Sequence, residues 1–180
     1  MGMLSIFFIT ACNKDVPEDP TIPNEEEVIT TLNFTLTPDG SGTPVVLTFQ
    51  DLDGDGGNVP IITGGVLDSN TTYYGSLELL NELENPATDI TEEVEEEGSD
   101  HQFFFQTSVN GMNVTYDDID VNGDPIGLST ILITNGTSTG TLTITLRHGP
   151  KKDASGVSDG DITNAGGETD IEVTFNVEVL

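Results

Sequence analysis

Apolar and polar residues alternate over most of the chain from Val28 onward, and this period of two constrains the fold more than any other feature. Successive side chains of a β-strand point to opposite faces, so each such segment is expected to be a strand with one buried face. The clearest apolar series are Leu32, Phe34 and Leu36; Val45, Leu47 and Phe49; Leu142, Ile144 and Leu146; and every second residue from Ile171 to Val179. No stretch shows convincing helical spacing, and clusters of Gly, Asp, Asn and Pro separate the segments. The pattern predicts an all-β fold, namely an antiparallel β-sandwich, either Ig-like or a partly open barrel.

An internal repeat predicts two related halves, 28–100 and 101–180. Leu47–Gly56 is similar to Val114–Gly123, and Phe103–Val109 aligns with Val173–Val179. Neither half offers an obvious closed core of its own, so we expect a single domain over 28–180.

The beginning of the chain is typical of a bacterial lipoprotein. The apolar run from Leu4 is followed by Ile9-Thr10-Ala11-Cys12, in which the only cysteine of the chain occupies the acylation position of a lipobox. Small residues before the cleavage site fit a signal peptide over 1–11, whose positively charged start is missing, so we expect the true start to lie upstream of Met1. The alternative is a short buried strand with a free thiol. Residues 12–27 contain Pro17, Pro20 and Pro23, spaced three residues apart, and are expected to form a disordered tether.

The charge excludes some partners and favours others. The chain has 32 acidic against 4 basic residues and a formal net charge of −28. Such a charge repels nucleic acid, so no nucleic-acid partner is expected, and it makes cations the first class of ligand to consider.

A repeated acidic loop predicts calcium sites. Asp51, Asp53, Asp55 and Gly56 match the first six positions of the calcium pattern D-x-[DN]-x-[DN]-G, and Asp118, Asp120, Asn122 and Gly123 match it again. Alternate oxygen ligands on a tight loop converge on a hard cation. The closing glutamate is absent from both loops, and Asp124 or the carboxylates near Asp159 and Asp161 are candidates for that role. The alternative is that these residues only build turns.

A second hypothesis places a transition metal at the two histidines. His101 follows the acidic run that contains Glu96 and Glu97, and both His101 and His148 have the phase of the core at the end of a predicted strand. If those ends meet, two imidazoles beside carboxylates suit Zn, Cu or Fe. The alternative is a solvated charge run with two structural histidines.

Signals of catalysis are weak, and the sequence predicts a protein that is not an enzyme. Gly136–Gly140 has the spacing of a nucleophile elbow, but that motif needs a strand-to-helix turn, and here it joins two threonine-rich strands.

Two resemblances concern the surroundings of the protein. Cys12–Asp15 resembles the export signal of surface-displayed lipoproteins of Gram-negative bacteria, which implies a domain on the outer face of the outer membrane. The alternative is a lipoprotein of the outer membrane that faces the periplasm. The mature chain is also similar to small acidic lipoproteins labelled "type 1 periplasmic binding fold superfamily protein". The segments that show this similarity are Ile90–Glu97, His101–Phe105 and Gly156–Asn164. That label refers to a larger two-lobed α/β structure, whereas the period of two in this chain predicts strands.

The second resemblance implies a function beside a TonB-dependent receptor. The expected protein is a lipid-anchored, calcium-stabilised binding module of the outer membrane that assists nutrient or metal uptake. One alternative is a structural or adhesive surface module without a small ligand. Another is a lipoprotein that scavenges Zn, Cu or Fe.

Overall fold

The computed structural model describes residues 27–54 and 57–180. The predicted signal peptide, Cys12, the tether as far as residue 26, and Asp55 lie outside the described residues. Among the described residues, no helix has both the length and the apolar character needed to cross a bilayer.

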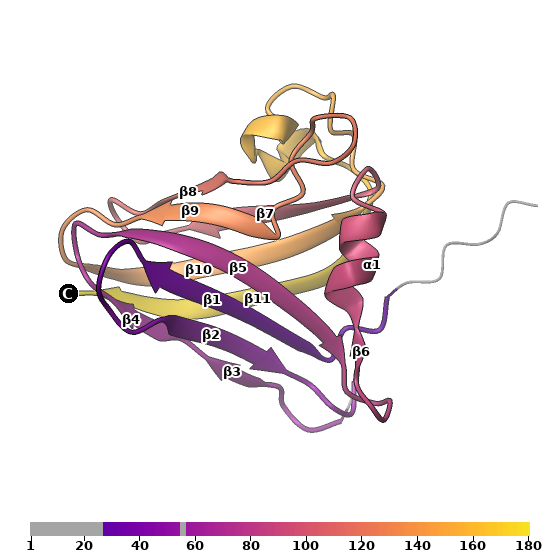
Figure 1. Ribbon diagram of the computed structural model, residues 1–180, viewed down its shortest axis with the longest axis horizontal. Coiled ribbons are helices and arrows are strands. Elements are labelled where there is room, and N and C mark those ends of the chain that lie inside the picture. Colours follow the sequence, from indigo (N-terminus) through magenta and orange to yellow (C-terminus); the bar gives the residue numbers. More distant parts are fainter. Residues whose placement is uncertain (1–26, 55–56) are drawn as a thin grey trace, which may run out of the picture.

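The strands of the described residues form two sheets that pack against each other (Figure 1). Sheet A has the order β3-β2-β1-β5-β9-β8, with β6 paired to β5, and sheet B has the order β4-β11-β10-β7. The strands of sheet A are β1 (Thr31–Pro38), β2 (Val45–Gln50), β3 (Ile61–Thr63), β5 (Thr72–Asn81), β6 (Thr88–Asp89), β8 (Asn113–Tyr116) and β9 (Ser129–Ile133). Those of sheet B are β4 (Gly65–Leu67), β7 (His101–Thr107), β10 (Ser138–His148) and β11 (Glu168–Val179). The predicted all-β sandwich is confirmed, and it is not a closed barrel.

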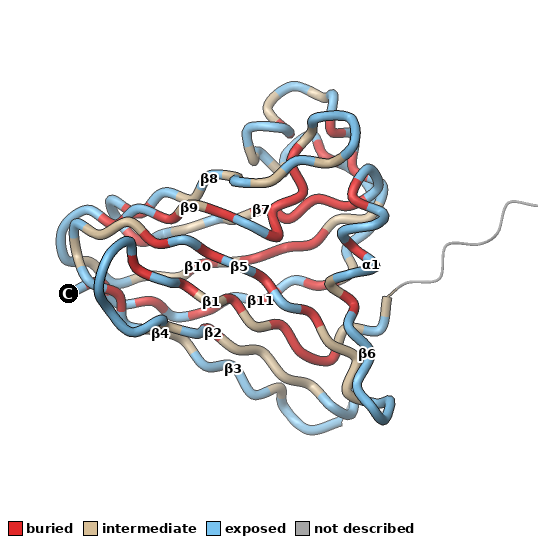
Figure 2. The backbone as a smooth tube through the Cα atoms, viewed as in Figure 1, coloured by how far each residue is buried: buried red, intermediate tan, exposed pale blue. Residues whose placement is uncertain are grey.

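The alternating residues face the core as predicted. The apolar residues of β1 and β10 are fully buried, and those of β11 nearly so, whereas Val45 and Phe49 are partly buried and pack against the core. Figure 2 shows this alternation of buried and exposed residues along the strands. On the outer face of sheet B, Thr143 and Thr174 share a hydrogen bond of 2.8 Å.

One pair of strands departs from the antiparallel expectation. β4 pairs with β11 in parallel, because the chain leaves β3 in sheet A and enters sheet B at once. The crossing occurs at Gly64, where a Cβ atom would lie 2.0 Å from the backbone oxygen of Asn176. A glycine is therefore required for this close approach of two backbones.

A short helix, α1 (Ile90–Glu96), was not expected from the sequence. Asp89 caps its start by accepting a hydrogen bond of 2.9 Å from the backbone N–H of Thr91. Ile90 and Val94 are buried on one side, and seven residues allow only this one i,i+4 apolar pair, which is too little to detect as a period. The 3₁₀-helices η1 (Val157–Asp159) and η2 (Ile162–Asn164) lie in the loop between β10 and β11.

The two predicted halves both contribute to both sheets. The first half supplies β1, β2, β3, β5 and β6 to sheet A and β4 to sheet B, and the second half supplies the other strands. One main cluster of buried apolar residues joins side chains from both halves.

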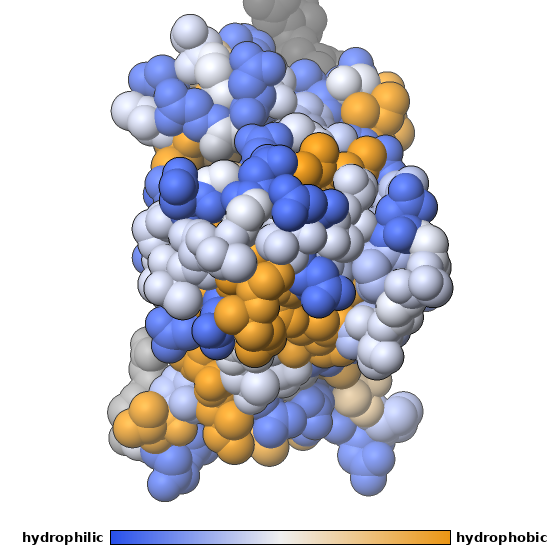
Figure 3. Space-filling model, turned by 90° about the vertical axis from the view of Figure 1, so that its left-hand side faces the viewer, coloured by the Kyte–Doolittle hydropathy of each residue, from blue (hydrophilic) through white to orange (hydrophobic). Residues whose placement is uncertain are grey.

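The two ends of the sandwich differ. The described chain begins at the end where α1 lies, whereas the C-terminus lies at the opposite end (Figure 1). Seen from the C-terminal end, hydrophobic side chains gather near the centre among polar ones (Figure 3). The exposed apolar residues Val66 and Leu180 belong to β4 and to the C-terminus.

Candidate metal centre

Four ligand-bearing side chains converge at the α1 end of the sandwich: Glu27, His101, His148 and Asp170, here called the His/carboxylate cluster. One ligand atom from each lies within 4.8 Å of all the others. The exposed fractions of the side chains are 3%, 0%, 16% and 1% in that order. The cluster is therefore buried, with His148 at its most accessible side.

Strand register brings the two histidines together. His101 is the first residue of β7 and His148 the last of β10, and they are direct partners across the antiparallel pair. Their ring centroids are 4.5 Å apart with the planes at 90°, and Nδ1 of His148 lies 2.9 Å from Nε2 of His101.

A β-bulge accounts for the position of Asp170. Strict alternation along β11 would place Asp170 on the wet face with Glu172. The register between β10 and β11 shifts at Leu146/Arg147, so that Arg147 pairs with Thr169 and no Cα partner falls to Asp170. Bulges redirect side chains locally, and here the Oδ2 atom of Asp170 lies 4.0 Å from Nε2 of His101.

Glu27 comes from the segment that leads into the other sheet. It lies four residues before β1, and its Oε1 atom is 3.0 Å from Nε2 of His101 and 3.8 Å from Nδ1 of His148. Its second oxygen, Oε2, is buried and has no hydrogen-bond partner among the described residues. A buried carboxylate oxygen without a partner is costly, so an additional positive group is expected there.

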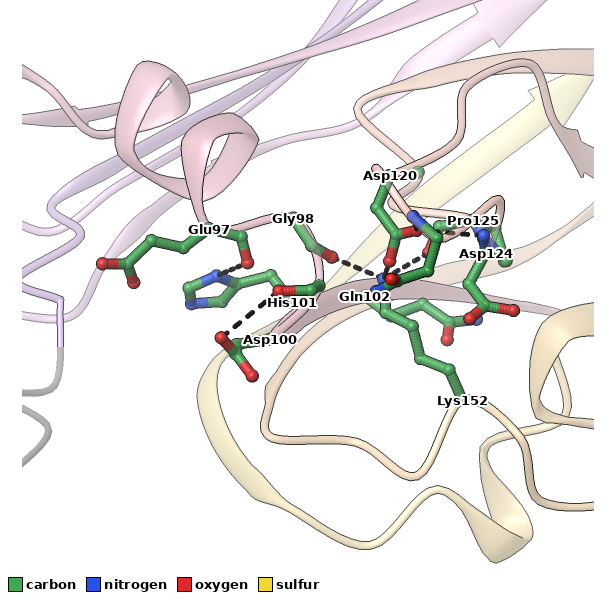
Figure 4. Close-up of polar contacts among 12 residues, drawn as sticks. Glu97, Gly98, Asp100, His101, Gln102, Asp120, Asp124, Pro125 and Lys152 are labelled. Atoms are coloured by element: carbon green, nitrogen blue, oxygen red, sulfur yellow. Dashed lines mark hydrogen bonds and ion pairs between the residues drawn. The ribbon is translucent and has the colours of Figure 1, made fainter.

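The contact of Nδ1 of His101 with a backbone oxygen assigns a proton to that nitrogen. Nδ1 lies 3.2 Å from the backbone oxygen of Glu97 at the end of α1 (Figure 4), and since a carbonyl can only accept, Nδ1 carries a proton. In the neutral ring Nε2 then has a lone pair that faces Glu27 and His148. Metal-binding histidines usually donate their other N–H group to a carbonyl or carboxylate in this way.

The spacing of the ligand atoms suits one ion. A tetrahedral ion with bonds of about 2.0–2.1 Å keeps its ligand atoms roughly 3.3 Å apart. The contacts of 2.9, 3.0, 3.8 and 4.0 Å in the cluster lie on both sides of this value. Two imidazoles with two carboxylates suit Zn, Cu or Fe better than a hard cation such as calcium.

Two residues predicted to join the histidines do not reach them. The side chains of Glu96 and Glu97 are exposed at the end of α1, and neither belongs to the cluster. Glu97 contributes through its backbone oxygen only. The acidic run therefore forms the exposed side of a short helix that leads into β7.

The first predicted calcium loop is a network of turns in its described part. Oδ1 of Asp51 accepts hydrogen bonds from the backbone N–H groups of Asp53 and Gly54, at 3.3 and 3.0 Å. Asp53 accepts two from Asn58, and these contacts lower its pKa below the ordinary value. Asp55 lies outside the described residues, so calcium at this loop stays a prediction.

The carboxylates of the second loop mostly accept hydrogen bonds from the protein itself. Asp118 accepts bonds from the backbone N–H groups of Gly127 and Ser129, at 2.7 and 2.9 Å. Oδ1 of Asp120 accepts bonds from those of Asn122 and Asp124, at 2.8 and 3.0 Å. Calcium at this loop also stays a prediction, and it would compete with these bonds.

A buried lysine supplies a positive charge to the second loop. Nζ of Lys152 lies 2.9 Å from Oδ2 of Asp120, 2.9 Å from the backbone oxygen of Pro125 and 2.5 Å from that of Gly98 (Figure 4). Lys152 is 6% exposed. The ammonium group thus joins the α1–β7 turn to the second loop, where three oxygens surround it as they would surround a metal cation.

The pKa of Asp120 makes this arrangement sensitive to acid. Burial by itself raises the pKa of Asp120, but the hydrogen bonds from Lys152 and from the backbone of Asp124 and Asn122 outweigh burial and lower it below 3.8. A carboxyl with a lowered pKa in the folded state stabilises the fold above its unfolded pKa, and this contribution is lost as the pH falls through the folded pKa.

We therefore expect the Asp120→Asn variant to differ most from the wild type at neutral pH. The difference in free energy of unfolding, measured by urea titration at several pH values, should shrink below about pH 4. Asp117→Asn, at an exposed neighbouring position, is the control for the change in net charge. A difference that is constant from pH 7 to pH 3 would contradict this account.

Sequence reasoning found the two histidines as candidates but missed Glu27 and Asp170. Glu27 was assigned to the end of the tether, and the phase of Asp170 pointed to the outer face of β11. Asp170 reaches the site through a β-bulge, and a single sequence gives no signal of a bulge at this position. Comparison of the chain with protein-family models, curated proteins and solved structures gives no match.

Proposed function

We propose that the protein binds a divalent transition-metal ion, with Zn²⁺ as the first choice, at the His/carboxylate cluster. The observation that supports this most is the meeting of three potential ligand atoms at His101: Nδ1 of His148 lies 2.9 Å and Oε1 of Glu27 lies 3.0 Å from Nε2 of His101. One shared proton cannot satisfy all three atoms well, whereas one metal ion accepts a lone pair from each.

The charge of the whole protein supports the same proposal. A net charge of −28 raises the local concentration of cations around the surface. The partly exposed His148 offers the approach to the buried ligands. Long-range attraction would then supply ions to the site, and the imidazoles would select transition metals over calcium.

The direct experiment is a calorimetric titration of the purified protein with Zn²⁺ and, separately, with Ca²⁺. We expect one Zn²⁺ per chain with an affinity at least roughly 100-fold tighter than that for Ca²⁺, since extracellular calcium sites have dissociation constants of about 10⁻⁴–10⁻³ M. Binding should weaken on acidification, because protons compete for the ligands. His101→Ala and the more accessible His148→Ala should each abolish tight binding.

Glu97→Gln is the matched control for Glu27→Gln. Both remove one negative charge near His101, but only Glu27 offers a side-chain ligand. We expect Glu27→Gln to weaken Zn²⁺ binding by about 10-fold or more and Glu97→Gln to leave it unchanged. Equal affinities in the wild type and in both histidine variants would refute the proposal.

The cellular setting is proposed on the sequence alone. A lipid anchor at Cys12 would hold the metal-binding module at the outer membrane, where it would serve as an accessory to TonB-dependent uptake of a nutrient or metal. A structural or adhesive module is the alternative, and weak binding of all transition metals would favour it. If calcium raises the melting temperature and still does so in His101→Ala, calcium binds at the Asp51 and Asp118 loops instead.

A further inference from the structure

The His/carboxylate cluster connects the beginning of the described chain to sheet B. Three of its residues belong to the long strands β7, β10 and β11, whereas Glu27 precedes β1 of sheet A. Figure 1 shows this first segment at the α1 end of the sandwich. A metal ion at the cluster would therefore join the segment before β1 to three strands of the opposite sheet.

Hydrogen bonds hold the chain firmly from Thr30 onward. The backbone N–H and the side-chain hydroxyl of Thr30 both donate to the backbone oxygen of Leu80, at 2.9 and 3.0 Å. The hydroxyl also accepts a bond of 2.8 Å from the N–H of Glu82, and the backbone oxygen of Thr30 accepts one of 2.8 Å from Asp51. Thr30 is thus the first of the described residues that sheet A fixes from several directions.

The three residues before Thr30 have few attachments. Val28 is 52% exposed, and Ile29 packs only partly buried against the core. Neither makes a hydrogen bond to another described residue. Among the described residues, the attachment of this segment depends, apart from the packing of Ile29, on the carboxylate of Glu27 and its contacts with the two histidines.

We infer that metal bound at the cluster attaches residues 27–29 to sheet B. The supply of metal would then control whether this segment is attached. This inference rests on the proposed function, because it assigns a consequence to metal bound at the same cluster. Without the ion, the buried Glu27 carboxylate shares its site with a second carboxylate, that of Asp170, and its release into water is favoured. With the ion, both carboxylates become ligands.

Cleavage after Glu27 by a glutamate-specific protease provides the test. The full chain is digested with Zn²⁺ or with chelator, and the rate at which the fragment beginning at Val28 appears is measured by mass spectrometry. The protease must bind the Glu27 side chain in its specificity pocket. A carboxylate that is bound to metal cannot enter that pocket, so the peptide bond after Glu27 is protected. We expect Zn²⁺ to slow this cleavage at least tenfold. Cleavage after Glu84, an exposed residue of the β5–β6 loop, is the internal control and should not change.

Parallel titration of the same samples separates the two proposals. In His148→Ala and in Asp170→Asn, Zn²⁺ should no longer protect the bond after Glu27, and two variants guard against misfolding of either one. Tight Zn²⁺ binding in the wild type with an unchanged rate of cleavage after Glu27 would overturn the inferred attachment of residues 27–29 by metal and leave the proposed function intact. Absence of Zn²⁺ binding would overturn both.

Discussion

Replacing Lys152 by methionine is expected to lower the free energy of unfolding by about 3–5 kcal/mol, because it leaves the carboxylate of Asp120 buried without its ion-pair partner. The side chains of Lys152 and Asp120 are only 5% and 1% exposed, so water cannot replace the lost ammonium group easily. The backbone oxygens of Gly98 and Pro125 also lose a donor. Urea unfolding at neutral pH measures the loss directly.

Two further variants identify the cause of this loss. Lys151→Met removes the same charge from an exposed neighbour and should change the free energy of unfolding by less than about 0.5 kcal/mol. The double variant Lys152→Met with Asp120→Asn should be clearly less destabilised than the sum of the single variants, because it no longer buries a lone charge. Equal losses for Lys151→Met and Lys152→Met would mean that net charge, and not the buried pair, matters.

Zinc is expected to raise the thermal stability of the wild type strongly. At a free Zn²⁺ concentration 100-fold above the dissociation constant, an ion that binds only the folded state adds about 2.7 kcal/mol. For a chain of this size this corresponds to a rise in Tm of roughly 5–10 °C. The effect should be large because the ion would connect the segment before β1, through Glu27, to sheet B, through His101, His148 and Asp170.

The controls for the melting experiment follow from the ligand set. Glu97→Gln should show the full rise in Tm, whereas His101→Ala should show none. A fragment that begins at Val28 lacks Glu27 and should respond less than the full chain. A rise in Tm that is the same in His101→Ala as in the wild type would place the zinc elsewhere and contradict the assignment.

Much of the fold follows from local pattern. Strand formation and the choice of buried face depend on alternation, which residues such as Leu142, Ile144 and Leu146 display plainly, and these side chains are all buried. The parallel pairing of β4 and the helix α1 were not predicted. Both are short, and both depend on contacts between segments distant in sequence, such as Gly64 against Asn176.

Only two of the four residues of the His/carboxylate cluster, the histidines, could be predicted from the sequence. The histidines carry a phase, so their position at the core side of strand ends was predictable, and the register places them opposite each other. Asp170 reaches them through a bulge, which reverses the face that alternation assigns. Glu27 lies before the first strand, where no period exists to place a side chain. The buried carboxylate of Asp120 in the second loop is neutralised by Lys152, which is remote from the loop in sequence.

The most direct test of the metal centre is X-ray absorption spectroscopy at the zinc edge of the protein loaded with one Zn²⁺ per chain. The account predicts a first shell with two imidazole nitrogens at about 2.0–2.1 Å together with carboxylate oxygens. Loss of the imidazole signal in His148→Ala, but not in Glu97→Gln, should accompany it. A shell of oxygens alone, unchanged when either histidine is replaced, would contradict the central claim.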